Sequence, residues 1–406
     1  MADDIIISYG KSSNEDSFVA GEEAITKCLE KFGAKNKPNI LFVFASSRYN
    51  HDDMLSGINQ HAKNIPIIGG TSGGIIFPEG IVEKSACVIA LSSKKIRLFT
   101  AISKNANANP QKAGSELAES LLGKSGAQKK NAKTMIILSD GLSGKCPQLI
   151  EGAKKILGQT FEIVGGALSD DLELKRTYQY FNGKACQNSA IGLLICGNIA
   201  TSTGVRSGWE SLGTRFKCTL AKENTVYKFE NKTAVDMLAE YLGKERAAKL
   251  PLIGHQYPIG ISQDIDSPEK YGNIQLIAPI SVDKQKGSIT FSEPIPENTD
   301  VTLTYSSRNT IIENTKQAAL QAKKILNESK PMLVFMFNSI ARKIVLGRRT
   351  NEEINAVKSV FGNDVPIIGF YTYGEIGPID KRIPPLAESR WHNQTSMIYA
   401  IGEQNP

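Results

Sequence analysis

"IPIIGGTSGG", residues 65–74, places a short apolar strand directly before paired glycines and small polar side chains. Altered copies of this stretch occur at 161–171 ("FEIVGGALSDD") and at 365–375 ("VPIIGFYTYGE"). Glycine after a strand permits a tight turn and the close approach of another backbone. The three copies therefore predict three strand-to-loop turns of one design, and such turns serve architecture, ligand binding or catalysis.

Each copy lies inside a longer unit with one order: a strand, a helix, a short strand, the glycine turn and a later strand. Near-continuous apolar runs are typical of strands that are buried on both faces, and the intervening helices supply one cover. The first strands of the units are "NILFVFASS" (39–47), "TMIILSDG" (134–141) and "MLVFMFNS" (332–339). The closing strands are "SACVIALSS" (85–93), "SAIGLLICG" (189–197) and "TSMIYAIGE" (395–403). This internal repeat implies duplication.

The predicted fold class is α/β, with two domains whose mixed sheets are built from these repeated strand–helix–strand units. Residues 1–229 hold two units and form the predicted N-terminal domain. Residues 230–406 hold one unit and, at 271–307, alternating residues that predict a β-meander. The third unit includes a helix predicted at 351–361, where Glu352 and Glu353 are favourable charges near the N-terminus.

The composition predicts a soluble, cytoplasmic protein. Hydrophobic residues make up 41% and charged residues 22% of the 406-residue chain, as in globular proteins. The N-terminus opens with two aspartates, and no apolar run approaches the ~20 residues of a membrane helix. The net charge of +7 comes from scattered lysines, which favours a solvated surface over nucleic-acid binding. Six cysteines without a C-x-x-C pair and four isolated histidines predict no metal site and no cofactor.

Small and polar side chains collect at the ends of the repeated strands. In α/β sheets ligands bind at such strand ends, because loops there present polar groups over a rigid base. The sequence therefore predicts a ligand site there. Its predicted residues are Gly70, Thr71, Ser72, Ser169, Asp170, Asn338, Ser339, Arg342, Phe370, Tyr371, Thr372, Tyr373 and Glu375.

Arg342, which follows the strand at 332–339, has two interpretations. Its guanidinium could bind a ligand carboxylate in a bidentate fork. Alternatively, it could form an ion pair with Glu375 that joins two loops. If both hold, Glu375 could orient Arg342 or accept a ligand ammonium, which suits a zwitterion. The first interpretation predicts that Arg342→Ala abolishes ligand binding with little change in the fold.

Motifs for phosphate binding and for catalysis are weak. "GGTSGG" lacks the spaced glycines and the following lysine of a P-loop. Ser139 and Asp140 in "LSDGLSG" are not set in a G-x-S-x-G elbow. The sequence therefore predicts that the protein is not an enzyme. The remaining enzymatic alternative is a reaction on a small metabolite with Asp170 as general base.

Two pairs of segments identify a family resemblance. "IIGGTSGGII" (67–76) and "IVGGALSDDL" (163–172) resemble the N domain of the FIST sensory family, and "LVFMFNSIARKIVLG" (333–347) with "VPIIGFYTYGEIGPI" (365–379) resemble its C domain. The resemblance covers roughly residues 38–402. It implies a ligand-binding sensory module of signalling proteins, for which amino acids are among the proposed ligands. Many members place the module before an output domain; here none follows, so a separate signalling protein is the expected partner.

The resemblance also carries a departure and an alternative. Members often have a cysteine where this chain has Ser339, so thiol chemistry at that point is absent here. A subset of the family binds haem and senses nitric oxide, which needs an axial ligand, most often histidine, with cysteine or methionine as alternatives. His51, His255 and His392 are the candidate imidazoles, and none lies inside the quoted motifs.

The leading expectation is a sensor that binds a small polar metabolite, such as an amino acid, at the strand ends. Arg342 would hold its carboxylate, and Glu375 or Asp170 would accept its ammonium. Three aromatic residues would form the wall of the site: Phe370, Tyr371 and Tyr373. A haem-based nitric oxide sensor and an enzyme acting on a small metabolite are the alternatives.

Overall fold

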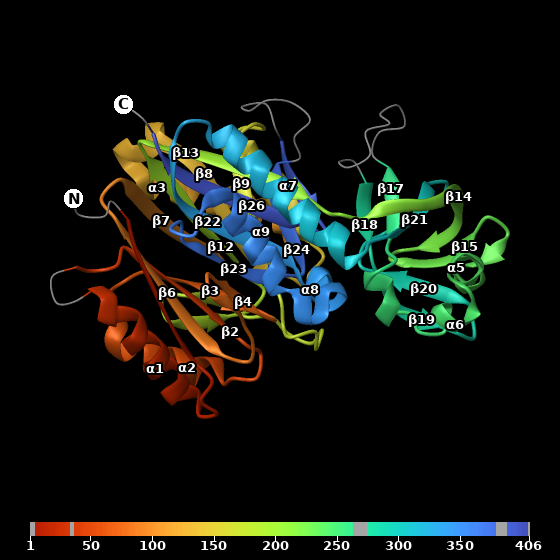
Figure 1. Ribbon diagram of the computed structural model, residues 1–406, viewed down its shortest axis with the longest axis horizontal. Coiled ribbons are helices and arrows are strands. Elements are labelled where there is room, and N and C mark those ends of the chain that lie inside the picture. Colours follow the sequence, from red (N-terminus) through yellow and green to blue (C-terminus); the bar gives the residue numbers. More distant parts are fainter. Residues whose placement is uncertain (1–4, 33–35, 263–273, 379–387, 405–406) are drawn as a thin grey trace.

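The computed structural model describes residues 5–32, 36–262, 274–378 and 388–404. A large body of sheets and outer helices carries a smaller domain, residues 210–305, at one end (Figure 1). We call this smaller domain the insert, because the chain leaves the body after β13 and returns to it at α7. Both termini lie at the end of the body that faces away from the insert (Figure 1).

Three segments of the body have the same order of elements, except that the third has one additional short helix, α8. The first contains β1 (Ile5–Ser12), α1 (Ser17–Leu29), β2 (Ile40–Ala45), α2 (His51–Ala62), β3 (Ile67–Thr71), β4 (Ile75–Phe77), β5 (Gly80–Val82) and β6 (Ala86–Ser93). The second contains β7 (Ile96–Ser103), α3 (Pro110–Ser125), β8 (Ala132–Asp140), α4 (Cys146–Leu157), β9 (Glu162–Leu168), β10 (Gln179–Phe181), β11 (Lys184–Cys186) and β12 (Ala190–Gly197). The third contains β13 (Ile199–Arg206), α7 (Arg308–Leu326), β22 (Lys330–Ser339), α8 (Ile340–Leu346), α9 (Asn351–Phe361), β23 (Ile367–Thr372), β24 (Gly374–Pro378), β25 (Ser389–His392) and β26 (Ser396–Glu403).

The body's three sheets share one strand order. The orders are β1-β6-β2-β3-β10-β11, β7-β12-β8-β9-β24-β25 and β13-β26-β22-β23-β4-β5. In each sheet the pair separated by a helix is parallel and the other pairs are antiparallel. Each sheet ends in a hairpin that a different segment supplies, so the three segments are tied together. The predicted class of mixed α/β sheets is confirmed; duplication stays a prediction.

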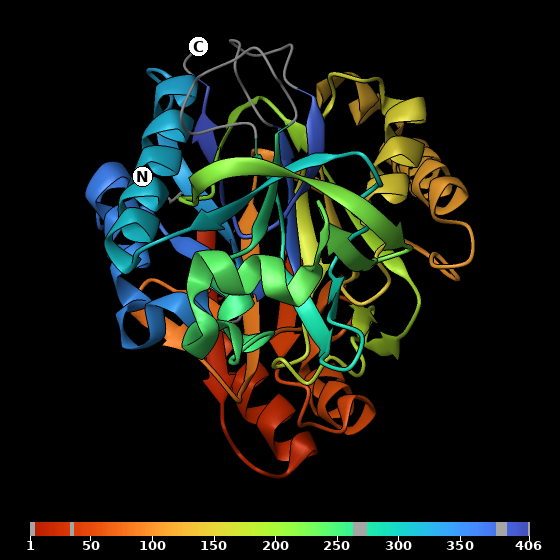
Figure 2. The same cartoon turned by 90° about the vertical axis from the view of Figure 1, so that its right-hand side faces the viewer.

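The central strands β2, β8 and β22 are apolar over most of their length because both of their faces are buried. In β2, Ile40, Phe42 and Phe44 face a central core between the sheets, and Leu41 and Val43 pack beneath the helices. Three helix pairs, α1 with α2, α3 with α4 and α7 with α9, cover the outside of the body (Figure 2). This two-sided burial explains the continuous hydrophobic runs in the sequence.

Polar caps set the starts of the main helices. The side chains of Asp16, Asn50, Asn109 and Ser307 each accept a hydrogen bond from a backbone N–H in the first turn of α1, α2, α3 and α7. Such caps satisfy donors that the helix itself leaves unpaired. No helix of the described residues has the length and apolarity to cross a membrane.

The insert is one highly twisted sheet with its own core. It contains β14 (Glu210–Lys222), β15 (Thr225–Phe229), β16 (Lys232–Thr233), α5 (Ala234–Leu242), α6 (Lys244–Ala247), β17 (Ile259–Ser262), β18 (Ile274–Ile277), β19 (Pro279–Asp283), β20 (Ser288–Phe291) and β21 (Asp300–Tyr305). Of the meander predicted at 271–307, residues 271–273 lie outside the described residues, and among the rest only β19 and β20 pair as consecutive strands. β18 and β21 are not neighbours of β19 and β20. Both pair with β17, and β21 also pairs with β14, so the strand order is β18-β17-β21-β14-β15-β20-β19.

Strand pairing crosses the domain boundary expected at 229/230. β13 pairs with β26, and β4 pairs with β23, so strands from the N-terminal half complete a sheet of the C-terminal half. The boundary itself stays a prediction.

The first glycine of each repeated turn is architectural. A Cβ atom on Gly69 would lie 1.8 Å from the carbonyl oxygen of Val43 on the neighbouring parallel strand. A Cβ on Gly165 would lie 2.1 Å from Ile137 O, and a Cβ on Gly369 would lie 1.9 Å from Met336 O. Real Cβ contacts of this kind do not occur, so only glycine fits where these strands approach so closely.

Candidate functional site

The three glycine turns meet at one junction, formed by residues 71–74, 167–172 and 371–374. Ser169 is its centre: its N–H donates to Thr71 O at 3.2 Å, and its hydroxyl donates to Tyr371 O at 2.8 Å. The same hydroxyl accepts from the N–H of Gly73 at 3.0 Å. A single serine therefore links all three turns.

The second glycines lie where the turns cross one another. A Cβ on Gly70 would meet Leu168 Cδ1 at 2.3 Å, and one on Gly166 would meet Thr372 Cγ2 at 2.5 Å. Four of the predicted site residues, Thr71, Ser72, Tyr371 and Thr372, are at most 1% exposed. The structure thus brings the predicted residues together, but they pack against each other.

Replacing Ser169 with alanine is expected to lower the free energy of unfolding by about 1–3 kcal/mol. The change leaves the buried N–H of Gly73 without its acceptor, and an unsatisfied buried group costs about that much. Ser56→Ala is the matched control, because its hydroxyl bonds to Asp52 O on an exposed helix face. Urea denaturation compares the two variants, and equal losses would mean that the junction adds nothing.

Asp170 does not fit the role of general base or of ammonium ligand. Its carboxylate is 1% exposed and accepts from the hydroxyl of Tyr373 at 2.5 Å. It also accepts from the backbone N–H groups of Leu174, Lys175 and Arg176 at 2.7–3.1 Å. These four donors saturate the carboxylate, which therefore orders the loop after β9.

Phe370 faces away from the loops. Its ring stacks on Phe44 with 4.3 Å between centroids, inside the central core. It is 2% exposed, so it supports the body and forms no wall of a ligand site in this structure.

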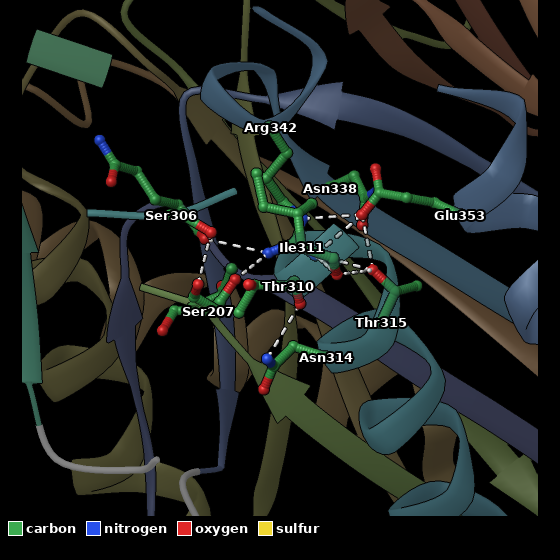
Figure 3. Close-up of polar contacts among 12 residues, drawn as sticks. Ser207, Ser306, Thr310, Ile311, Asn314, Thr315, Asn338, Arg342 and Glu353 are labelled. Atoms are coloured by element: carbon green, nitrogen blue, oxygen red, sulfur yellow. Dashed lines mark hydrogen bonds and ion pairs between the residues drawn. The ribbon is translucent and has the colours of Figure 1, made fainter. Parts of the chain in front are cut away.

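Arg342 lies in a second buried cluster, which we call the polar node: Thr315, Asn338, Arg342 and Glu353 (Figure 3). The guanidinium and the carboxylate of Glu353 are both 0% exposed, with Nη2 2.8 Å from Oε1. Nε also donates to Oε1 at 2.9 Å. The expected ion pair with Glu375 is therefore wrong. The N-terminal turn of α9 packs over the end of β22 and supplies the acid instead.

The other donors of Arg342 are all engaged by the protein. Nη1 donates to the carbonyl oxygens of Ser207 and, at 3.3 Å, Gln394. Nη2 donates to Ile311 O at 2.9 Å and to Thr315 Oγ1 at 2.7 Å. A ligand carboxylate would have to displace one of these acceptors. The geometry therefore gives Arg342 a structural role. The expectation that its guanidinium is free to bind a ligand carboxylate through two hydrogen bonds is wrong.

Asn338 and Ser339 end β22 beside the node. Asn338 donates from Nδ2 to Glu353 at 3.0 Å, and the N–H of Ser339 donates to Thr395 O at 3.0 Å. Both residues are buried, at 0% and 4% exposure. They position the start of α8 and the turn between β25 and β26.

Glu375 is a buried carboxylate held by hydroxyl and amide donors. It accepts from the Thr372 hydroxyl and, at 3.0 and 2.6 Å, from the N–H and hydroxyl of Thr395. Burial raises its pKa to about 7, against these hydrogen bonds, which lower it. Thr395 in turn lines a cleft, so Glu375 does not line this cleft but holds a residue of its wall in place.

This cleft, of about 380 Å³, lies between the body and the insert. The body supplies α4 and the β25 region, and the insert supplies β18 and Glu293. Its lining residues are Pro147, Ile150, Glu151, Lys154, Ile274, Gln275, Leu276, Glu293, Glu388, Arg390, Trp391, His392, Asn393 and Thr395. Its volume is that of a small-molecule site, and its polar side chains converge from both parts of the chain.

Glu293 crosses the cleft from the insert to the body. Its Oε1 accepts from Trp391 Nε1 at 3.0 Å and from the amide of Asn393, and its Oε2 accepts from Gln275 Nε2 at 2.7 Å. Burial raises the pKa of Glu293, while these three donors lower it. Among the described residues no lysine or arginine forms an ion pair with it. A carboxylate in this position is suited to a bound cation.

The remaining charges of the cleft are paired with one another. Lys154 is 1% exposed, and its Nζ lies 2.9 Å from Glu151 and 2.8 Å from Glu388. Arg390 lies 3.2 Å from Glu388, with half of its side chain exposed. Burial lowers the pKa of His392 to about 4, so this imidazole is neutral near pH 7. Three carboxylates thus face two cations among the described lining residues.

The third glycine turn supports the cleft from behind. A Cβ on Gly374 would meet Cζ2 of Trp391 at 2.0 Å, so glycine is required for the indole to lie there. Sequence reasoning found Gly374's turn and His392, but it missed Glu293, Lys154 and Trp391. A tryptophan beside His392 in "RWHNQTS" was the available signal, since aromatic rings are frequent in ligand sites.

The three candidate haem ligands differ in their surroundings. His51 is hydrogen-bonded through Nδ1 to the Tyr180 hydroxyl at 2.7 Å, and His392 through Nε2 to Gly377 O at 2.9 Å. Both imidazoles are buried, and a ring nitrogen of each is engaged in a hydrogen bond within the protein, so they do not fit the role of axial haem ligand. His255 borders a groove of about 500 Å³, and its buried Nδ1 has no hydrogen-bond partner in the described part of the chain. Of these three imidazoles, that of His255 therefore fits an axial role best.

Comparisons with known proteins agree with the resemblance in the sequence. The FIST N domain matches residues 39–232, and the FIST C domain matches residues 234–378. No curated protein matches the chain. A cyanuric acid hydrolase from A. caulinodans aligns over 99% of this chain and 100% of its own, at 7% identity and a TM-score of 0.38. A chorismatase aligns over 98% of both chains, at 5% identity and a TM-score of 0.37. Similarities this low carry no argument about activity, whereas the two domain matches span most of the chain. The chain belongs to the FIST family of small-ligand sensory domains.

Proposed function

We propose that this protein is a sensor for a small polar metabolite with an ammonium group, such as an amino acid, and that the ligand binds in the cleft between body and insert. The observation that carries the proposal is Glu293, a partly buried carboxylate held only by neutral donors among the described residues. The family supplies the sensory role. The cleft supplies the volume and the charge.

The charge of the cleft favours a cation. With His392 neutral, the described lining residues carry one more negative than positive charge. A carboxylate has about four acceptor positions, and the three donors to Glu293 leave one for an ammonium. A charge-assisted hydrogen bond there would be stronger than a neutral one.

The rest of the cleft suits the other parts of an amino acid. The partly buried indole of Trp391 offers an aromatic wall for a side chain. The guanidinium of Arg390 is half exposed, and it would bind a carboxylate in exchange for its contact with Glu388 at 3.2 Å. Lys154 is already neutralised by Glu151 and Glu388, so it orders the wall of the cleft.

Replacing Glu293 with glutamine is expected to weaken binding of the amino acid about 10- to 100-fold. Removing a hydrogen bond to a charged group costs about 1.5–3 kcal/mol, and about 1.4 kcal/mol is tenfold in affinity. The amino acid is first found by thermal shift, where a ligand at 100 times its Kd stabilises by about 2.7 kcal/mol. Calorimetric titration then compares the wild type with the variant.

Glu240→Gln is the matched control for this titration. It removes the same charge from the insert, but Glu240 pairs with Lys232 on an exposed surface away from the cleft. Wild-type affinity in Glu240→Gln with a loss in Glu293→Gln supports the site. Equal affinity in all three proteins would place the ligand elsewhere.

The alternatives have their own tests. A sensor returns its ligand unchanged, so turnover of the bound metabolite would favour an enzyme. A haem band in the absorption spectrum, lost on changing His255 to alanine, would favour haem sensing. We further propose a cytoplasmic location, in keeping with six free cysteines, and signalling through a separate protein.

A further inference from the structure

The insert is joined to the body by two short crossings, residues 207–209 and 306–307. The crossings lie side by side, because the Ser306 hydroxyl donates to Gly208 O at 2.5 Å. Just beyond them Glu210 pairs with Tyr305 at the start of the insert's sheet. Gly208 has φ +90°, a conformation that glycine adopts readily. Two adjacent crossings of this kind form a hinge.

Arg342 contacts both sides of this hinge from inside the body. Its Nη1 donates to Ser207 O, on the outgoing crossing (Figure 3). Its Nη2 donates at 2.9 Å to Ile311 O, in the first turn of α7 directly after the returning crossing. The guanidinium also lies 5.9 Å from the ring centre of Trp209. Glu353 fixes the guanidinium to the body, so the polar node anchors the hinge.

The same guanidinium reaches the floor of the cleft. Nη1 lies 3.3 Å from Gln394 O, in the turn between β25 and β26. The neighbours of Gln394 in that turn, Asn393 and Thr395, line the cleft. One residue therefore touches the hinge and the ligand-binding turn together.

Other described groups also hold the insert against this part of the body. A small apolar cluster, Trp209, Leu276, Ile311, Val345 and Leu346, spans the junction. On the cleft side, Glu293 accepts from Trp391 and Asn393 across the gap, and we call this contact the latch. Relative motion of two parts of a chain is expected unless the interface between them is large and hydrophobic, and here one apolar cluster of five residues is joined by polar contacts.

The polar node and the neighbouring Gln394 contain side-chain atoms that could form further hydrogen bonds. Asn338 Oδ1 and both side-chain polar atoms of Gln394 are buried without a hydrogen-bond partner among the described residues. Gln394 is 2% exposed and Asn338 0%. Unsatisfied groups of this kind are rare in folded proteins and call for a reason. Here they can form alternative hydrogen bonds when the neighbouring turn or crossing shifts.

We infer that the insert swings about the two crossings, that the Glu293 latch favours the closed position, and that Arg342 couples the swing to the cleft. An ammonium on the free position of Glu293 leaves the latch intact and adds contacts across the gap. Ligand binding therefore shifts the population toward the closed form. This inference rests on the proposed function only for the identity of the ligand, because the hinge and the latch exist without it.

The test uses ligand-free, full-length protein and the distance between two nitroxide labels. The labels replace exposed Glu119 on α3 and exposed Glu245 on α6, in a Cys186→Ser background, since the other cysteines are buried. Pulsed dipolar spectroscopy gives the distribution of distances. The expected result is a narrow distribution for the parent and a broader one, shifted to other distances, for Trp391→Phe, which removes the indole donor of the latch.

Ser306→Ala and Arg342→Lys test the hinge. Ser306→Ala loses the bond between the crossings and a weak contact with Ser307 O, and both charged partners of the polar node stay in place, so this variant remains folded if Arg342→Lys does not. Both should broaden the distribution, whereas Glu240→Gln on the insert's surface should match the parent. Parent-like distributions in Trp391→Phe and Ser306→Ala would overturn the inference. Because no ligand is added, this result is independent of whether Glu293→Gln weakens amino acid binding.

Discussion

Replacing Arg342 with methionine is expected to lower the free energy of unfolding by about 3–5 kcal/mol, the cost of breaking a buried ion pair from one side. The carboxylate of Glu353 would remain at 0% exposure with its cation gone. The carbonyl group of Ser207 would lose the Arg342 donor as well, and that of Ile311 would keep only its other donors, such as the Thr315 hydroxyl. Chemical denaturation, followed by circular dichroism, measures the loss.

Arg349→Met is the control for this experiment. Arg349 also pairs with a glutamate, Glu352, but both side chains are more than a third exposed. Exposed pairs contribute little, so its loss should be much smaller. The account of the polar node is wrong if the two variants lose the same stability. The sequence alone suggested the opposite outcome, lost ligand binding in an intact fold, because it could not show that every donor of Arg342 is engaged.

In Glu375→Gln, the free energy of unfolding is expected to rise relative to that of the wild type as the pH increases from 4.5 to 8. Burial raises the pKa of Glu375 from 4.5 to about 7, so the folded state binds its proton more tightly than the unfolded state. The stabilisation from this group is full below about pH 4.5 and is lost as the pH rises through about 7. At about 1.4 kcal/mol for each pH unit, the loss is about 3 kcal/mol.

Glutamine fits the hydrogen bonds of this position. Its carbonyl oxygen can accept from the N–H of Thr395, and its amide can donate to the Thr372 hydroxyl, which itself donates to Asn338 O at 3.1 Å. The difference in unfolding free energy between variant and wild type is measured at several pH values. Glu240→Gln, at an exposed site, serves as the reference. A difference that does not change across this range would show that Glu375 titrates normally.

The body of the fold was largely predictable because its physical causes are local. Strands buried on both faces leave a continuous apolar run, which the sequence shows at β2, β8 and β22. Glycines that admit a neighbouring carbonyl oxygen leave a recognisable turn, as at Gly69, Gly165 and Gly369. Exchange of hairpins among the three sheets has no such local signal, because it depends on where whole segments pack.

The same limit explains the candidate site. The sequence suggested Glu375 as the acid that pairs with Arg342, and only the packing of α9 over β22 shows that Glu353 takes this place. Glu293 and Trp391 are 98 residues apart and belong to different domains, so no pattern in the chain joins them. The sequence left open whether the three glycine turns meet, and their contacts with one another could be seen only in three dimensions.

The most direct test of the account is the fluorescence of Trp391 during titration with amino acids. The chain has two tryptophans, so Trp209→Phe leaves Trp391 as the single reporter in the cleft. If the ligand binds in the cleft, we expect a saturable change in Trp391 emission for the same amino acid that raises the melting temperature. We expect this change to be lost in Glu293→Gln. An amino acid that stabilises the protein while Trp391 emission stays constant would contradict a ligand site in this cleft.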